Sequence, residues 1–188
     1  MKIALVSGTF DPPHLGYLLM ARMSLWTEKI DNVWFLPCWN HAFEKKPSSF
    51  EHRTNMLHAM INDCLPIDME RFSVCAEEKK IESTYSIEII NHLVNKYPEH
   101  SFTLVLGSDN YWKLLNWKNF SEVRNMINVL WVSRNGQPNL PYGETVIGYT
   151  NTDISSTQIR KLFKSNNDVS HLVSKSVIEY AKKHGLYK

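Results

Sequence analysis

A predicted turn between a buried strand and a helix constrains this chain more than any other feature of its sequence. The apolar run at residues 3–6 predicts a buried strand, and the apolar run at 18–21 predicts a helix. Gly8 lies between them, and its missing Cβ atom lets the backbone come close to a ligand. His14 and Tyr17 are three residues apart and therefore share one face of the first helical turn. Free N–H groups at the helix start favour a phosphate there, although an ordinary βα unit without a ligand has the same local pattern.

Strands and helices alternate along the rest of the chain. Strands are predicted at 2–7, 32–36, 71–75, 101–106, 128–132 and 145–149. Helices are predicted at 14–27, 50–63, 85–96, 120–126, 155–164 and 174–184, with loops at 38–49 and 134–143. Several strands are continuous apolar runs, which is typical of a parallel sheet covered on both faces. The pattern predicts an α/β fold with a Rossmann-like, doubly wound parallel sheet and helices on both faces.

Composition narrows the class of protein. With 188 residues, 43% of them hydrophobic, and no linker-like stretch, we expect a single domain over residues 1–188. A formal net charge of +2 does not indicate a nucleic-acid partner. No apolar run approaches the ~18 residues of a membrane span, so no membrane partner is expected. The three cysteines form no C-x-x-C pair and there is no leader pattern, which predicts reduced thiols and a cytoplasmic location.

Polar residues follow the predicted strands, where ligands of parallel sheets bind. They include Asn40, His41, Lys46 and Arg53 after the second strand, Gly107, Ser108, Asp109 and Asn110 after the fourth, and Ser133 and Arg134 after the fifth. After the last strand, Ser155 or Ser156 can cap a helix on which Arg160 supplies a cation. Two helix N-termini at one sheet edge could cradle a triphosphate; the alternative is a capped helix with Arg160 on its solvated face. Neither a Walker A loop nor G-x-G-x-x-G occurs.

The turn at residues 8–16 resembles the signature of the nucleotidyltransferases that carry an (H/T)-x-G-H motif. Within them, the chain resembles the nicotinate/nicotinamide mononucleotide adenylyltransferases nearly from end to end. The runs that carry this resemblance, in the family's order, are 8–16, 50–53 with Met56, 83–86, 106–110 through Trp117, 154–160, and 177–180 with 185–187.

The resemblance implies that the phosphate of nicotinate or nicotinamide mononucleotide attacks the α-phosphorus of ATP, with Mg²⁺ on the phosphates and no protein cage for the metal. The catalytic residues it implies are His14, Tyr17, Lys46 and Arg160. The ATP-binding residues it implies are Gly8, Thr9, Phe10, His14, Gly107, Asp109, Ile154, Ser155, Ser156, Thr157 and Arg160. The mononucleotide-binding residues it implies are Asn40, Lys46, Tyr85, Ser86, Trp117 and Arg134. Taken singly, Trp117 could be a core aromatic, Lys46 a solvated lysine replaceable by Lys45, and Asp109 a helix cap.

Tyr17 departs from the family motif, which has histidine at this place. Tyrosine can donate a hydrogen bond but carries no positive charge near neutral pH. Three interpretations follow: a slower enzyme, a natural or engineered substitution that traps a bound complex, or a nucleotide-binding sensor without catalysis. A related transferase acting on phosphopantetheine is a further alternative. The sequence leaves open the choice between nicotinate and nicotinamide mononucleotide, and it leaves open whether the chain forms a homo-oligomer.

Overall fold

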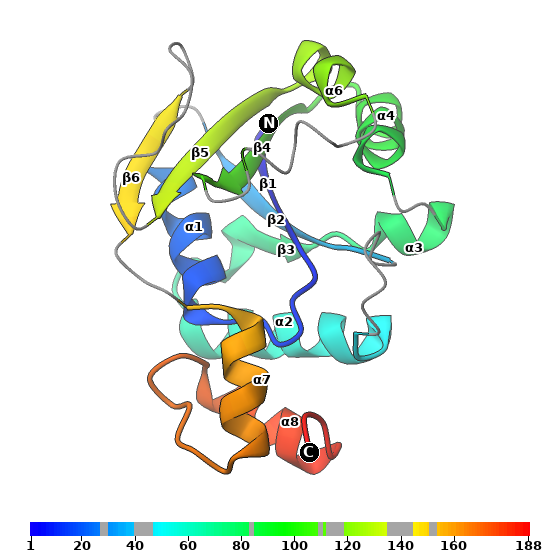
Figure 1. Cartoon of the computed structure of the whole chain (residues 1–188). Helices are drawn as coiled ribbons and strands as arrows, with labels where there is room; N and C mark the ends of the chain where they lie inside the picture. The colour runs from blue at the N-terminus through cyan, green and yellow to red at the C-terminus, as the bar shows by residue number, and fades with distance from the viewer. Residues whose placement is uncertain are drawn as a thin grey trace.

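The computed structural model describes residues 1–26, 30–39, 47–82, 85–108, 111, 119–134, 145–150 and 154–188, with 134 and 148–150 described by their backbone alone. Six parallel strands form one sheet in the order β3-β2-β1-β4-β5-β6. They are β1 (Lys2–Gly8), β2 (Asn32–Pro37), β3 (Phe72–Val74), β4 (Ser101–Gly107), β5 (Asn128–Arg134) and β6 (Val146–Thr150). The predicted parallel sheet is confirmed, and the three strands of each half extend outward from the β1–β4 pair (Figure 1).

Helices cover both faces of this sheet. They are α1 (Leu15–Leu25), α2 (Phe50–Cys64), α3 (Glu77–Ile81), α4 (Ser86–Lys96), α6 (Phe120–Met126), α7 (Ser156–Lys164) and α8 (Lys175–Lys183). A 3-10 turn at Met69–Arg71 precedes β3. In Figure 1, α4 and α6 lie together at one side, whereas α7 and α8 lie beside α2 at the bottom of the view. None of the helices within the described ranges is long and apolar enough to cross a membrane.

Alternate residues of the strands enter two separate cores, one on each face. From β1, Ala4 and Val6 pack with α1, α2, α7 and α8, whereas Ile3 and Leu5 pack with α4 and α6. Successive side chains of a strand point to opposite faces, so burial on both faces requires an uninterrupted apolar run. This is why the sequence of β1 shows no polar alternation.

The predicted boundaries need a few corrections. His14 is the N-cap of α1 and not its first residue. The strand β5 continues through Arg134, where a loop was expected, because its backbone pairs with Thr150 of β6. The short helix α3 was not predicted, and the last helix ends at Lys183. The predicted loops at 38–49 and 134–143 lie largely outside the described residues.

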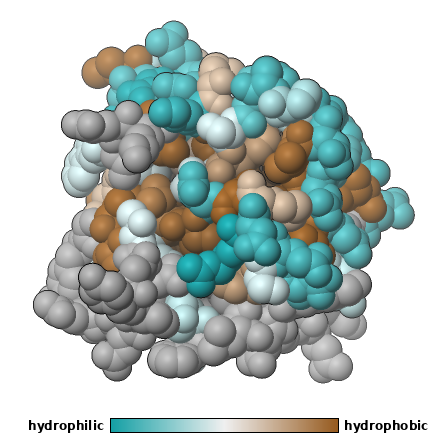
Figure 2. All heavy atoms as spheres, turned by 90° about the horizontal axis from the view of Figure 1, so that it is seen from above, coloured by the Kyte–Doolittle hydropathy of each residue, from teal (hydrophilic) through white to brown (hydrophobic). Residues whose placement is uncertain are grey.

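The strands end close to one another at one edge of the sheet. Gly8, the last residue of β1, pairs with Pro37, the last residue of β2, so the two strands end side by side. Gly107 pairs with Val132 on the other side of the sheet. Figure 2 shows the molecule from above, from the opposite side, where hydrophobic residues in the middle have hydrophilic ones beside them toward the top and right of the view. The carboxyl end of β1 and the turn that follows it lie toward the lower side of Figure 1.

Candidate active site

The turn between β1 and α1 is buried and held by its surroundings. Phe10 has a left-handed backbone conformation, with a φ of 54°, and its side chain is fully buried. Asp11 and His14 are only 5% and 2% exposed, although both are polar. The Cys38 N–H donates to the Gly8 carbonyl at 3.1 Å, which ties the end of β1 to the end of β2. The predicted phosphate-binding stretch is therefore a packed turn.

Aromatic stacking organises the inner side of this turn. The rings of His14 and Tyr17 have centroids 4.3 Å apart and are inclined by 28°, which confirms that these residues share a face. Tyr17 also lies 4.5 Å from the ring of Phe10. A Cβ atom at Gly8 would lie 2.9 Å from the hydroxyl oxygen of Tyr17. On that side of Gly8, the Tyr17 ring occupies the space that a Cβ atom would need. The sequence suggested a different reason for glycine here, namely the close approach of a ligand.

The start of α7 meets the same turn. Ser155 is the N-cap, and its Oγ accepts from the N–H of Gln158 at 3.2 Å. Ser156 instead donates its hydroxyl to the Pro12 carbonyl at 2.9 Å. The Nη1 of Arg160 donates to the Asp11 carbonyl at 2.7 Å. Arg160 is thus directed at the first turn and is not simply solvated, and the two helix starts meet as expected.

Arg53 joins the turn to its neighbour after β2. It is 1% exposed, and its guanidinium donates to three carbonyl oxygens. The acceptors are Thr9 at 2.8 Å, Ser48 at 3.0 Å and Trp39 at 3.1 Å. The sequence placed Arg53 near the sheet edge but gave it no role. Only the fold shows that its carbonyl partners come from two separate loops.

Glu78 lies beside Arg53 and holds the same second loop. Its carboxylate accepts from the N–H of Trp39 at 2.7 Å. Burial raises the pKa of Glu78 to about 7, against the lowering effects of that hydrogen bond and of the Arg53 charge. Burial also raises the pKa of the nearby Cys38 thiol to about 12, with the Glu78 charge as the next cause. A raised pKa leaves little of the Cys38 thiol in the nucleophilic thiolate form at neutral pH.

Glu77, the neighbour of Glu78 on α3, is held by two lysines and a histidine. Lys80, His92 and Lys96 lie 2.6 Å, 2.8 Å and 2.7 Å from its carboxylate. Burial raises its pKa, but the hydrogen bonds from Lys80, Lys96 and His92 outweigh that effect and lower the pKa to about 2. The contact fixes α3 against α4, whose N-cap is Tyr85 and whose first residue is Ser86. Two residues predicted to bind the mononucleotide therefore begin a braced helix.

The remaining predicted site residues fall into two groups. Gly107 ends β4, Ile154 precedes the cap of α7, and Thr157 accepts from Arg160 at 3.3 Å. Arg134 is the last residue of β5, and its side chain is not described. Lys46, Asn40, Asp109 and Trp117 lie outside the described residues. Within those residues, no cluster of three His, Cys, Asp or Glu side chains could hold a metal ion.

Comparisons with known proteins agree with this architecture. The cytidylyltransferase-like family model matches residues 5–162. A relative from Myxococcus xanthus, named nicotinate-nucleotide adenylyltransferase, is 32% identical over 187 residues, which cover 100% of this chain and 95% of that protein. A relative of the same name from Bacillus cytotoxicus is 32% identical over 192 residues, covering 100% of this chain and 98% of that protein.

Solved structures share the fold. Nicotinic acid mononucleotide adenylyltransferase of Plasmodium falciparum, complexed with NaAD, has a TM-score of 0.84 at 21% identity, covering 99% of this chain and 97% of that one. The same protein complexed with APC has a TM-score of 0.82. The fold and the family model place the chain in the cytidylyltransferase-like class of nucleotidyltransferases. Within that class, it belongs to the nicotinate-nucleotide adenylyltransferase family.

Proposed function

We propose that the protein transfers the adenylyl group of ATP to nicotinate mononucleotide, giving nicotinate adenine dinucleotide and pyrophosphate. The observation that carries the proposal is the junction of the two predicted phosphate-binding helices, where Ser156 and Arg160 contact the turn at Pro12 and Asp11. The choice of nicotinate over nicotinamide follows the names of the relatives and the dinucleotide bound in the Plasmodium structure.

The reaction is a displacement at phosphorus. A phosphate oxygen of the mononucleotide forms a bond to the α-phosphorus of ATP. The bond from that phosphorus to the oxygen bridging to the β-phosphate breaks, and its electron pair leaves with pyrophosphate. Protein groups contribute by positioning the reactants and by placing positive charge where negative charge develops. Lys46 and Arg160 serve that electrostatic role, His14 holds ATP phosphate, and Tyr17 can donate a hydrogen bond.

The two substrates use different parts of the sheet edge. For ATP we retain the first turn with Gly8, Thr9, Phe10 and His14, the end of β4 with Gly107 and Asp109, and residues 154–157 with Arg160. For the mononucleotide we retain Asn40, Lys46, Tyr85, Ser86, Trp117 and Arg134. Support comes from the braced loops on the second side, where Arg53 and Glu78 hold Trp39. We also retain one nucleotidyltransferase domain over residues 1–188.

Magnesium fits this arrangement as an ion carried by the substrate. The carboxylate of Asp11, which belongs to the turn, already accepts from Tyr187 and from the Ser48 N–H. Mg²⁺ binds mainly phosphate oxygens and water in such sites. It would neutralise charge on the departing pyrophosphate, while Arg160 and the N–H groups of α7 contact the phosphates from the protein side.

The test is a pyrophosphate-release assay with ATP and Mg²⁺, run with nicotinate mononucleotide and with nicotinamide mononucleotide in parallel. We expect nicotinate adenine dinucleotide as the chromatographed product and a higher kcat/KM with nicotinate mononucleotide. Binding of both substrates without release of pyrophosphate would instead make the protein a nucleotide sensor. Equal kcat/KM for the two mononucleotides would contradict the substrate preference.

A further inference from the structure

The chain end returns to the first turn of the protein. After α8, Gly185 and Tyr187 both have a φ of 64°, and the Leu186 N–H donates to the Ala181 carbonyl at 2.9 Å. Tyr187 belongs to this closing turn. Its hydroxyl donates to Oδ1 of Asp11 at 2.7 Å, across 176 positions of sequence.

We propose that Tyr187 is a positioning residue for ATP, which holds the 9–14 turn in its binding shape through the carboxylate of Asp11. The proposal rests on the proposed function, because it assigns Tyr187 to the ATP side of that site. It deepens the function by naming a residue that acts through another and does not itself contact the substrate.

Asp11 is the point where the turn receives most of its outside support. Its Oδ1 accepts from Tyr187, and its Oδ2 accepts from the Ser48 N–H at the longer distance of 3.3 Å. Its backbone carbonyl accepts from Arg160 at 2.7 Å. The hydrogen bond from the Tyr187 hydroxyl is therefore the shorter of the two that the Asp11 carboxylate accepts. Hydrogen bonds to a charged group are among the stronger ones in proteins.

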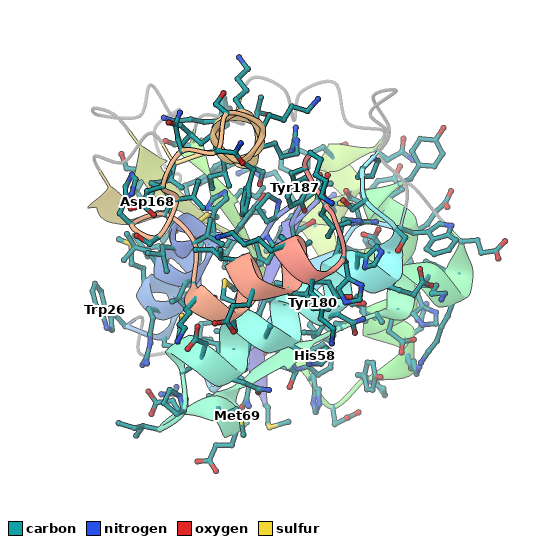
Figure 3. The ribbon with its side chains drawn as sticks, turned by 90° about the horizontal axis from the view of Figure 1, so that it is seen from below. Trp26, His58, Met69, Asp168, Tyr180 and Tyr187 are labelled. Carbon is teal, nitrogen blue, oxygen red and sulfur yellow. The ribbon has the colours of Figure 1, made fainter. Side chains whose placement is uncertain are left out.

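The phenol is fixed in position and keeps its proton. Its ring centroid lies 5.5 Å from that of Phe163, and its hydroxyl lies 3.8 Å from the sulfur of Met56. Burial raises the pKa of Tyr187, and the charge of Asp11 raises it further. Tyr187 is therefore a donor over the whole working range of pH. Figure 3 shows it between α7 and α8, whereas Tyr180 lies where α8 meets α2.

Movement of Asp11 would displace the residues that are predicted to contact the phosphates. Pro12 follows it and receives the hydroxyl of Ser156, and His14 lies two residues further on. Displacements of about 1 Å are enough to cost ~10²-fold in rate when they disturb the reacting geometry. Loss of the Tyr187 hydroxyl should thus weaken ATP binding more than mononucleotide binding, because the hydroxyl bonds directly to the ATP-side turn. It reaches the loop after β2 only through Asp11, whose contact with the Ser48 N–H is the longer one.

The experiment compares Tyr187→Phe with Tyr180→Phe. The second variant is a matched control, because the Tyr180 hydroxyl bonds with His52 and Asn55 at 3.0 Å each and does not touch the turn. Calorimetry gives the dissociation constants for an α,β-methylene analogue of ATP and for nicotinate mononucleotide. We expect Tyr187→Phe to raise the constant for the ATP analogue about tenfold. The constant for the mononucleotide should stay within twofold, and Tyr180→Phe should change neither.

A structural role alone would lower the melting temperature of both variants without separating the two ligands. The proposal is overturned if the ATP constant of Tyr187→Phe changes less than threefold, or if both constants rise together. If Tyr187→Phe does not fold, Asp11→Asn is measured in the same way and judged by the same thresholds. If the wild-type chain binds the analogue but releases no pyrophosphate, the proposed function fails while the comparison of constants still decides the role of Tyr187.

Discussion

Tyr17 lies where the family motif has histidine, and its surroundings show what tyrosine changes there. Its ring fills the space beside Gly8 and stacks on His14. A phenol carries no positive charge that could stabilise the α-phosphate in the proposed reaction. Because removal of one charge-stabilising donor costs roughly 10²–10³ in kcat, we predict that Tyr17→His raises kcat by about two orders of magnitude. Pyrophosphate release at saturating ATP and mononucleotide measures it.

The control for this variant is Tyr97→His. Tyr97 stacks on His100 and contacts Trp34, and it takes no part in the first turn. Its replacement should leave kcat unchanged. If Tyr17→His does not increase kcat, the phenol is not a catalytic defect and the other cations of the site carry the charge.

Glu78 gives the molecule a defined pH dependence of stability. Its pKa is about 7 in the folded protein and 4.5 in the reference state, because burial disfavours the carboxylate. The folded protein therefore keeps this proton while the unfolded chain loses it, so stability falls as the pH rises from about 4.5 to about 7. We predict that Glu78→Gln removes this pH-dependent decrease in the free energy of unfolding, which is on the order of 3 kcal/mol.

Urea unfolding at pH 5 and pH 8 tests the prediction. Glu78→Gln should match the wild type at pH 5 and exceed it at pH 8, because Gln keeps an acceptor for the Trp39 N–H without the buried charge. Glu82→Gln, at an exposed position, is the control and should leave the free energy of unfolding unchanged at both pH values. An equal difference between Glu78→Gln and wild type at both pH values would contradict the assignment.

Among the elements, strands were easier to predict than the contacts that position the site. The strand β1 could be predicted because burial on both faces leaves an apolar run in the sequence itself. The helix α3 could not be, since its five residues contain four charges and no apolar period. Its stability comes from tertiary contacts. Glu78 accepts a hydrogen bond from the Trp39 N–H, and Glu77 accepts one from Lys96 of α4. Such partners become known only with the fold.

The planar guanidinium of one buried arginine supports the segments after β1 and β2 together. Arg53 donates to three carbonyls, and a lysine ammonium lacks the planar geometry to reach all of them. We predict that Arg53→Lys lowers the free energy of unfolding by about 1–3 kcal/mol because buried carbonyls lose their donor. The KM values for ATP and for the mononucleotide should both rise, since both loops lose an anchor.

Arg71→Lys is a matched control for that variant. Arg71 also donates to two carbonyls, those of Asp31 and Ile30, but it lies beside the amino end of β3, away from the site. Chemical unfolding and steady-state kinetics should show a loss of stability without a change in either KM. A KM change as large in Arg71→Lys as in Arg53→Lys would show that general destabilisation is responsible.

For the whole molecule, the candidate site depends on chain ends that the sequence keeps far apart. Asp11 belongs to the first turn, whereas its partner Arg160 belongs to α7 and its partner Tyr187 follows α8. Alternation of strands and helices predicts that strand ends meet at one edge of the sheet. It contains no information on which side chain of the C-terminal segment reaches which atom of the turn. That choice follows from how α7 and α8 pack on α2 and on the core that contains Ala4 and Val6.

Burial on both faces of the central strand leads to the last prediction, which concerns global stability. Ile3 is fully buried in the core formed with α4 and α6, whereas Ile67 is 91% exposed. We predict that Ile3→Ala lowers the free energy of unfolding by about 2–5 kcal/mol, because it removes apolar contacts and leaves a cavity. The same substitution at Ile67 should cost less than about 0.5 kcal/mol.

Urea unfolding of the two alanine variants measures this difference. Because Ile3 lies near the amino end of β1, away from the carboxyl edge where the turn begins, Ile3→Ala should keep both KM values of the wild type at temperatures where it remains folded. Equal losses of stability at Ile3 and Ile67 would contradict a sheet buried on both faces. A raised KM in folded Ile3→Ala would mean that the core formed with α4 and α6 also shapes the proposed substrate loops.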